Sequence, residues 1–141
     1  MLSAYPACFF KEGNGYSVIF PDLNNLATCG TTLDEAFSMA VDCLAGYLYW
    51  LNQDDEVIPA ASSMQAINSS EIAKELEITP SEAFVNMVTV DVSEYAKIHF
   101  EKSVKKTLSI PAWLNKAALE QGINISLVLQ DALKAQLHIA K

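Results

Sequence analysis

The sequence lacks any apolar run long enough to span a membrane. Its apolar stretches fall short of the roughly 18 residues that a membrane-spanning helix requires. Residues 1–11 also lack the basic start and following apolar stretch that are typical of a secretory signal. We therefore expect a cytoplasmic protein that has no membrane partner.

Cysteine is scarce and its spacing is irregular. Cys8, Cys29 and Cys43 form no Cys-x-x-Cys pair, and no pair of histidines lies near them. Zinc sites usually combine cysteines and histidines at such short spacings, so no metal site is indicated. Because free cysteine is among the most often buried residues, we expect all three to be reduced and structural.

Patterns typical of catalysis are also missing. His99 and His138 have no serine or cysteine at a readable spacing, and the glycine-containing segment 13–15 lies between two expected strands instead of opening a helix. The carboxylates that a two-metal nuclease needs do not converge by pattern. We predict no enzyme, no catalytic residue and no cofactor. A residual nuclease would be supported only by RNA cleavage that depends on magnesium and is abolished by Asp22→Asn.

Charge is distributed unevenly along the chain. Residues 1–100 contain fourteen acidic and three basic residues, a net charge of −11. Residues 101–141 contain three acidic residues and six lysines, a net charge of +3, and the two parts together give −8. An acidic body attracts a basic partner, whereas a lysine-bearing segment can approach phosphate. The chain is therefore expected to combine two binding functions.

The first ninety-odd residues predict a small α+β domain. Apolar runs at 5–10 and 16–20 flank a Gly-Asn-Gly turn, which predicts a hairpin, and a third short strand is expected at 27–31. Thr32 and Glu35 match a capping box. Apolar residues then recur at three- and four-residue spacing as far as Leu51, which predicts an amphipathic helix packed on the sheet.

The segment after this helix completes the domain. A loop at 57–70 precedes a short expected helix at 71–76 and a valine-rich strand at 84–92. The predicted order is therefore β-β-β-α-β, and the domain is assigned to residues 1–95. Residues 96–103 are predicted to be a linker whose apolar side chains can still pack.

The last segment, 104–141, predicts a strand followed by two helices. The strand covers 104–110, Pro111 opens the first helix, Gly122 ends it, and Ser126 caps a second helix that runs to about Leu137. So short a segment buries too little apolar surface to be stable alone, so we expect an obligate homodimer. The predicted dimer core is Leu108, Ile110, Leu114, Leu129 and Leu133.

The same segment predicts a DNA-binding surface. If two such strands pair antiparallel, Lys105, Thr107 and Ser109 face outward, and a two-stranded ribbon fits the major groove. These three residues are the predicted base contacts. Asn124 and Ser126, at the start of the second helix, are the predicted phosphate contacts. The lysines also fit another interpretation, in which they protect an edge strand from aggregation.

Two sets of motifs resemble known families. The stretch VKKTLSIPAWL at 104–114, followed by GINISLVLQDAL at 122–133, resembles a ribbon-helix-helix repressor. The stretches YPA at 5–7, GYSVIFPDL at 15–23 and TCGTTLDEA at 28–36 resemble the HicB antitoxin family in order and spacing. Together the matches extend over nearly the whole chain.

This resemblance implies a type II toxin–antitoxin system. The chain would bind and neutralise a small basic HicA-type toxin that cleaves messenger RNA. It would also repress its own operon by binding operator DNA as a homodimer or a higher even oligomer. The resemblance further implies a partial RNase H-like fold for the N-terminal domain. Some family members carry a helix-turn-helix instead, and the strand expected before Pro111 favours the ribbon-helix-helix form here.

One alternative function remains open on the sequence alone. The chain would then be a free-standing ribbon-helix-helix transcriptional regulator whose N-terminal domain senses a small ligand. A gene for a small basic protein beside this one would favour the antitoxin, and its absence would favour the ligand sensor.

Overall fold

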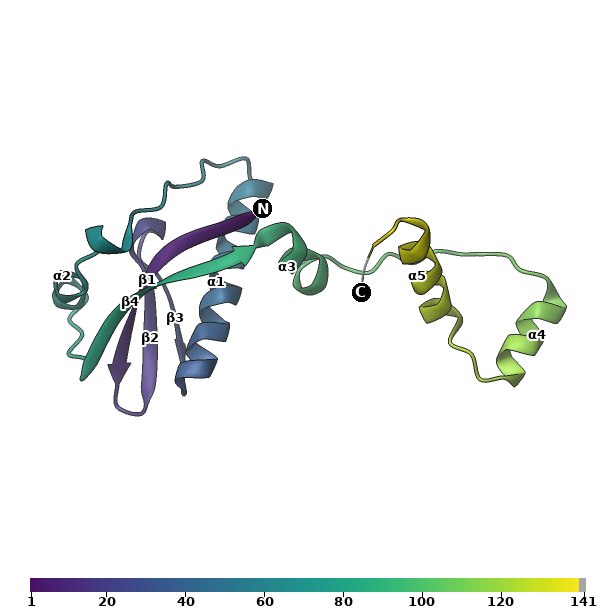
Figure 1. The fold of residues 1–141 in the computed structure, drawn as a ribbon, viewed down its shortest axis with the longest axis horizontal. Helices are drawn as coiled ribbons and strands as arrows, with labels where there is room; N and C mark the ends of the chain where they lie inside the picture. The colour runs from purple at the N-terminus through teal and green to yellow at the C-terminus, as the bar shows by residue number, and fades with distance from the viewer. Residues whose placement is uncertain (140–141) are drawn as a thin grey trace. The chain divides into compact units, whose positions relative to one another are not determined.

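The chain divides into two compact units, Met1–Lys102 and Ser103–Lys141, which we call the sheet unit and the helical unit. The structure is a computed structural model that describes residues 1–139 (Figure 1). The sheet unit combines a four-stranded antiparallel sheet with three α-helices, and the helical unit contributes two more. The predicted mixed α+β class is confirmed. Within residues 1–139, no helix is both long and apolar enough to cross a bilayer.

The sheet has the strand order β3-β2-β1-β4, and every neighbouring pair is antiparallel. The central strand β1 pairs with β4 over ten residues, from Leu2 opposite Asp91 to Lys11 opposite Glu82. All four predicted strands of this unit are present, and β1 is longer than predicted because β4 supports it along its length. The strands are β1 (Leu2–Glu12), β2 (Gly15–Phe20), β3 (Leu26–Gly30) and β4 (Glu82–Asp91).

The turn between β1 and β2 is the predicted tight hairpin. Glu12 lies opposite Gly15, so Gly13 and Asn14 form a two-residue loop. Gly13 has a φ of +59°, and a positive φ at the first central position of such a loop strongly favours glycine. The hairpin therefore follows from local sequence alone.

Helix α1 (Leu33–Gln53) begins at the predicted cap. The Thr32 hydroxyl oxygen accepts a hydrogen bond from the backbone N–H of Glu35 at 3.1 Å. The Glu35 carboxylate accepts a hydrogen bond from the Thr31 hydroxyl at 2.7 Å, so it binds a side chain instead of the backbone N–H of Thr32. The capping residue is confirmed, and the second half of the motif uses a neighbouring threonine.

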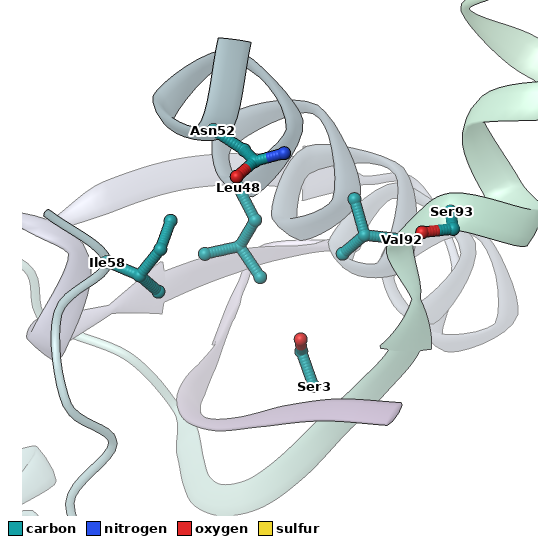
Figure 2. A pocket seen from close by; sticks show the side chains of 6 residues that line it. All are labelled: Ser3, Leu48, Asn52, Ile58, Val92 and Ser93. Atoms are coloured by element: carbon teal, nitrogen blue, oxygen red, sulfur yellow. The ribbon is translucent and has the colours of Figure 1, made fainter. Parts of the chain in front are cut away.

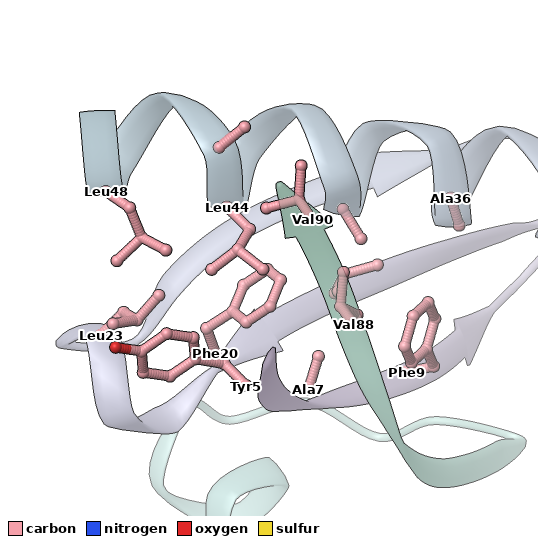
Figure 3. Packing of buried hydrophobic residues seen from close by; sticks show 13 residues of the cluster. Tyr5, Ala7, Phe9, Phe20, Leu23, Ala36, Leu44, Leu48, Val88 and Val90 are labelled. Carbon is pink, nitrogen blue, oxygen red and sulfur yellow. The ribbon is translucent and has the colours of Figure 1, made fainter. Parts of the chain in front are cut away.

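The main core lies between α1 and one face of the sheet (Figure 3). The helix contributes Ala36, Ala40 and Leu44, which are fully buried. Phe9 and Phe20 fill the space on the sheet side, and neither is exposed to solvent. The two alanines of the helix leave room for the phenylalanine rings of the sheet, which lets the two layers pack closely.

The opposite face of the sheet carries a smaller apolar cluster. Cys8, Phe10 and Ile19 are buried there, together with Ala73 from the short helix α2 (Ser69–Glu75). Burial raises the pKa of the Cys8 thiol to about 11, so this thiol stays protonated at neutral pH. Cys8 therefore acts as a packing residue, as predicted.

The loop between α1 and α2 is tied to the sheet unit at two points. The Tyr5 hydroxyl donates to the carbonyl of Pro59 at 2.5 Å. The Asp22 carboxylate accepts hydrogen bonds from the backbone N–H and the hydroxyl of Ser62, each at 2.7 Å. The loop also contains the short 3-10 helix η2 (Met64–Ala66), and η1 (Pro21–Leu23) supplies the aspartate that holds it.

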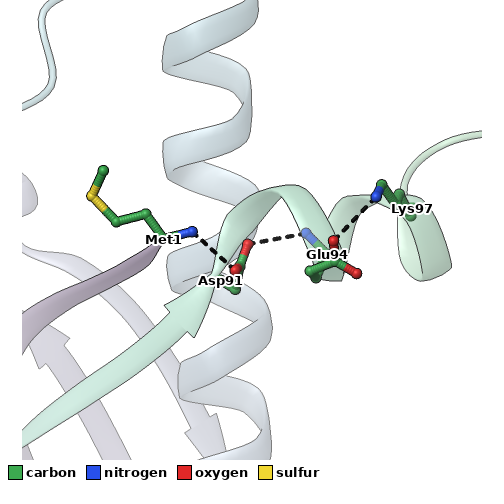
Figure 4. Close-up of polar contacts among 4 residues, drawn as sticks. All are labelled: Met1, Asp91, Glu94 and Lys97. Carbon is green, nitrogen blue, oxygen red and sulfur yellow. Dashed lines mark hydrogen bonds and ion pairs between the residues drawn. The ribbon is translucent and has the colours of Figure 1, made fainter. Parts of the chain in front are cut away.

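Helix α3 (Val92–His99) occupies much of the segment in which the sequence predicted a connection. Asp91 caps it by accepting a hydrogen bond from the Glu94 N–H at 3.2 Å, and it also pairs with the ammonium group of Met1 at 3.1 Å (Figure 4). Glu94 pairs in turn with Lys97 at 3.1 Å. Residues 96–99 of the predicted linker, 96–103, are therefore helical, because α3 has its own cap and packs on α1.

The contact between α3 and α1 uses one hydrogen bond and several rings. The Tyr95 hydroxyl donates to Asp42 at 2.9 Å. The centroids of the Phe100 and Tyr49 rings are 5.4 Å apart. A Cβ atom at Gly46 would lie 3.7 Å from the Phe100 ring. Helix α3 is therefore a structural part of the sheet unit.

The helical unit contains α4 (Ala112–Glu120) and α5 (Ile125–Gln136), which confirms the two predicted helices. Gly122 follows α4 with a φ of +67°, as expected for a residue that ends a helix. The cap of α5 is Asn124, whose side chain accepts a hydrogen bond from the Leu127 N–H at 3.1 Å. The prediction that Ser126 caps this helix was wrong by two residues.

The predicted strand at 104–110 does not form in the single chain. Residues 104–110 form neither a helix nor a strand, and all of them are exposed. A strand needs a second strand to satisfy its backbone N–H and C=O groups, and the rest of the helical unit is helical. The predicted partner of this strand is a second copy of the chain, so the strand stays a prediction for the homodimer.

Candidate protein and nucleic-acid interfaces

The helical unit has no core of its own. Between 103 and 139, no residue is buried, and only Ala118 and Leu129 are half-buried. Four of the predicted dimer-core residues remain exposed, with 53% of Leu108, 44% of Ile110, 42% of Leu114 and 52% of Leu133 accessible. Apolar surface of this extent marks an interaction site.

An open hollow of about 370 Å³ lies between α5 and the segment before α4. Val104 and Lys106 line it from that segment, and Leu129 and Leu133 line it from α5. The three predicted base contacts do not line this hollow; they are Lys105, Thr107 and Ser109. The three predicted base contacts therefore lie outside the hollow, and their contact with DNA stays a prediction.

The predicted core and contact residues are only partly brought together. Leu129 and Leu133 share the hollow with Ser126, Gln130 and Ser103. Leu108, Ile110 and Leu114 do not line it and remain exposed. The structure therefore groups the two leucines of α5 in the hollow, although Leu133, like the other three predicted core residues, stays exposed.

The start of α5 presents backbone donors. The side chain of Asn124 is engaged by the Leu127 N–H, and the Ser126 hydroxyl accepts a hydrogen bond from the Gln130 side chain at 3.4 Å. No hydrogen bond within residues 1–139 uses the backbone N–H groups of Ile125 or Ser126. Free N–H groups at a helix start favour a bound anion such as phosphate.

The sheet unit is strongly acidic and has few internal ion pairs. Residues 1–102 contain fifteen acidic residues and four lysines, a net charge of −11. In the part of the chain that the structure describes, the ion pairs are Met1 with Asp91 and Lys97 with Glu94. Most carboxylates of this unit therefore face solvent without a cation from their own chain.

A small open pocket of about 180 Å³ lies at the C-terminal end of α1 (Figure 2). Its walls come from four segments of the sheet unit: the start of β1, the end of α1, the loop that follows α1, and the start of α3. The lining residues are Ser3, Leu48, Asn52, Ile58, Val92 and Ser93. Sequence reasoning missed this pocket because it depends on contacts between residues far apart in the chain.

Helix α3 had a sequence signal that was not used. Asp91 and Glu94 have the spacing of a capping residue and the acidic residue three positions later. No comparable local pattern predicts the pocket, or the hydrogen bonds that join the loop after α1 to Tyr5 and Asp22. Across residues 1–139, no three histidine, cysteine or acidic side chains gather closely enough to hold a metal ion.

Comparison with known proteins assigns the family. Residues 5–123 match the family model described as the HicB-like antitoxin of bacterial toxin–antitoxin systems. The chain belongs to the HicB-like antitoxin family. The resemblance to the HicB antitoxin family is confirmed, and this family consists of antitoxins and not enzymes.

Individual proteins are also similar to this HicB-like antitoxin. A chain of the toxin–antitoxin complex from Streptococcus pneumoniae is 33% identical, with a TM-score of 0.61 over 96% of this chain and 99% of that one. Antitoxin HicB 2 of Photorhabdus laumondii is 36% identical over 59 residues, 42% of each protein. An uncharacterized 14.9 kDa protein of Haemophilus phage HP1 is 29% identical over 111 residues, 78% of this chain and 74% of that protein.

Proposed function

We propose that this antitoxin binds and neutralises a small basic HicA-type toxin that cleaves messenger RNA, and represses its own operon, in the cytoplasm. Residues 1–95 bind the toxin in this proposal, within a partial RNase H-like fold. Residues 104–141 form a ribbon-helix-helix that dimerises and binds operator DNA. The proposal rests on the assigned family and on the opposite charges of the two units.

The observation that carries the toxin-binding part is the net charge of −11 on the sheet unit. A protein that binds RNA needs a basic surface, and an acidic partner attracts such a surface and covers it. The related chain from Streptococcus pneumoniae belongs to a toxin–antitoxin complex, which supports a protein partner for this chain as well. Covering the RNA-binding surface is sufficient for neutralisation, and no catalytic step is needed.

An RNA-cleavage assay tests this part. The small protein encoded beside the antitoxin gene is incubated with labelled messenger RNA, and the full-length antitoxin is titrated in. Cleavage should fall to the background level near stoichiometric antitoxin. Higher salt should slow the association, because screening weakens attraction between exposed charges. Cleavage that continues in a large excess of antitoxin would contradict the proposal.

The DNA-binding part rests on the absence of any buried residue between 103 and 139. Two copies would cover the exposed leucines of each other and pair their 104–110 segments as an antiparallel ribbon. Lys105, Thr107 and Ser109 would then face the bases. Backbone N–H groups near Asn124 and Ser126 would face phosphate.

Two lysine variants separate base reading from general charge. Lys105→Ala should weaken operator binding by about 1–3 kcal/mol if the lysine contacts a guanine. Lys106→Ala removes the same charge from the side that lines the α5 hollow, so its loss should be smaller. Gel-shift titration at fixed salt measures both affinities. An unchanged affinity for Lys105→Ala would rule out this base contact.

A further inference from the structure

The C-terminal end of α1 carries an acidic triplet where its charge is least favourable. Asp54, Asp55 and Glu56 follow the last helical residue and are all exposed. The last turn of α1 contains no basic residue, and no ion pair within 1–139 involves the triplet. A helix C-terminus already bears partial negative charge and favours cations. A cation from another molecule would therefore relieve repulsion that this chain does not relieve itself.

The pocket at the end of α1 adjoins this triplet. Asn52 and Ile58 both line the pocket, and the triplet lies between them in the chain. Leu48, Ile58 and Val92 supply apolar walls, as Figure 2 shows, while Asn52 adds a polar amide. The site therefore combines an apolar hollow with carboxylates that lie, in the chain, between two of its lining residues.

The loop that forms one wall is already held in place. The hydrogen bonds from Tyr5 to Pro59 and from Ser62 to Asp22 fix it immediately after the pocket residue Ile58. Burial, and then the nearby Asp22 carboxylate, raise the pKa of Tyr5, so its hydroxyl remains a donor at neutral pH. A preformed wall lowers the cost of ordering the site on binding.

Exposed apolar side chains surround the same end of the helix. Val57 is 88% exposed, and Trp50, in the last turns of α1, is 61% exposed. Aromatic and apolar residues are typical of the contact centre of a protein interface, and polar residues such as the triplet are typical of its rim. The pocket thus lies in a surface suited to a protein partner.

We propose that this pocket and the acidic triplet form the docking site for a lysine or arginine side chain of the basic toxin. The aliphatic stem lies against Leu48, Ile58 and Val92, and the cationic head lies near the triplet and the end of α1. An anionic ligand is repelled by the triplet. A second sheet unit is also repelled, because it too has a net charge of −11. This inference rests on the proposed toxin binding and specifies where it occurs.

Two matched triple variants of the full-length chain test the site. The first, Asp54→Asn, Asp55→Asn and Glu56→Gln, neutralises the triplet. The control, Glu71→Gln, Glu75→Gln and Glu77→Gln, removes the same charge from exposed positions in and just after α2. Calorimetric titration with the purified toxin should show roughly tenfold or greater weakening for the first variant, and less than about threefold for the control.

A third variant tests the pocket itself. Ser93→Phe places a ring at the pocket lining and should weaken toxin binding about as much as the loss of the triplet. Thermal unfolding of the free proteins provides the structural control. Neutralising the triplet should leave the Tm unchanged or raise it, because it removes negative charge from a helix C-terminus. A lowered Tm would instead indicate a structural role and overturn the inference.

The binding outcomes also separate this inference from the proposed function. Equal weakening by both triple variants would show that total charge, and not this pocket, determines binding. Toxin binding would then stand and the docking site would be wrong. Failure of the unmodified chain to bind the toxin would contradict the proposed function itself.

Discussion

At the scale of single residues, two glycines of the sheet unit face opposite constraints. A Cβ atom at Gly30 would lie 2.4 Å from the backbone nitrogen of Ala36, whereas one at Gly46 would meet only the Phe100 ring at 3.7 Å. Gly30→Ala must therefore push β3 away from α1, and we expect it to lower the free energy of unfolding by about 2–3 kcal/mol. Gly46→Ala should raise it by about 0.5–1 kcal/mol, because glycine is unfavourable inside a helix.

Urea denaturation of the two glycine variants measures these opposite changes. Each serves as the control for the other, since both add a single methyl group. Equal stabilities of the two variants would contradict the close approach of Gly30 to the start of α1.

A second prediction at this scale concerns acid stability. The backbone N–H of Glu94, and then the ammonium group of Met1, hold the pKa of Asp91 below its ordinary value. Because the folded pKa is the lower one, the carboxylate stabilises the fold above its unfolded pKa. That stability is lost as pH falls through the folded value. Asp91→Asn should therefore lower the Tm near neutral pH and flatten its decline below about pH 4. A Tm curve parallel to that of the unmodified chain would contradict this.

At the scale of elements, α3 depends on its contact with α1. Phe100→Ala removes the ring that lies beside Tyr49 and Gly46, while Ile98→Ala changes a side chain that is 78% exposed. We expect the first variant to accelerate amide hydrogen exchange over 92–99 by roughly tenfold or more. The second should have little effect on exchange. Similar protection in both variants would show that α3 does not need this contact.

Local patterns predicted the elements whose signals are complete within a few residues. The hairpin followed from Gly13 and its neighbours, and α1 followed from Thr32 and the apolar spacing after it. The ten-residue pairing of β1 with β4 and the packing of α3 join distant segments, and a single sequence contains no direct signal for such register. The strand expected at 104–110 is absent from the single chain for a related reason, because its predicted partner is a second copy.

For the candidate sites, the sequence predicted which segments are acidic or basic, but not which distant residues come together. It located the acidic and basic parts of the chain. It could not locate the pocket, since Ser3, Leu48 and Val92 meet only after the sheet and α1 have packed. The predicted dimer and DNA contacts remain predictions, because they depend on a second chain and on DNA.

At the scale of the whole molecule, the exposed leucines predict dependence on a second copy. Leu133→Glu places a charge in the α5 hollow and should reduce the mass in solution to the 15.4 kDa of the single chain. Operator binding should be lost with it, while inhibition of the toxin by the sheet unit persists. Met39→Glu, at a 40% exposed position of the sheet unit, is the control and should remain dimeric. Light scattering during gel filtration distinguishes these masses, and a dimeric Leu133→Glu protein would contradict the predicted interface.

The central claim is that the acidic sheet unit has a basic protein partner. Isolating the tagged full-length chain from its own cells at moderate salt, and identifying bound proteins by mass spectrometry, tests this claim most directly. The account predicts one small basic protein, encoded beside the antitoxin gene and released as salt is raised. Recovery of operator DNA without any protein partner would contradict the claim, and would favour a ligand-sensing transcriptional regulator instead.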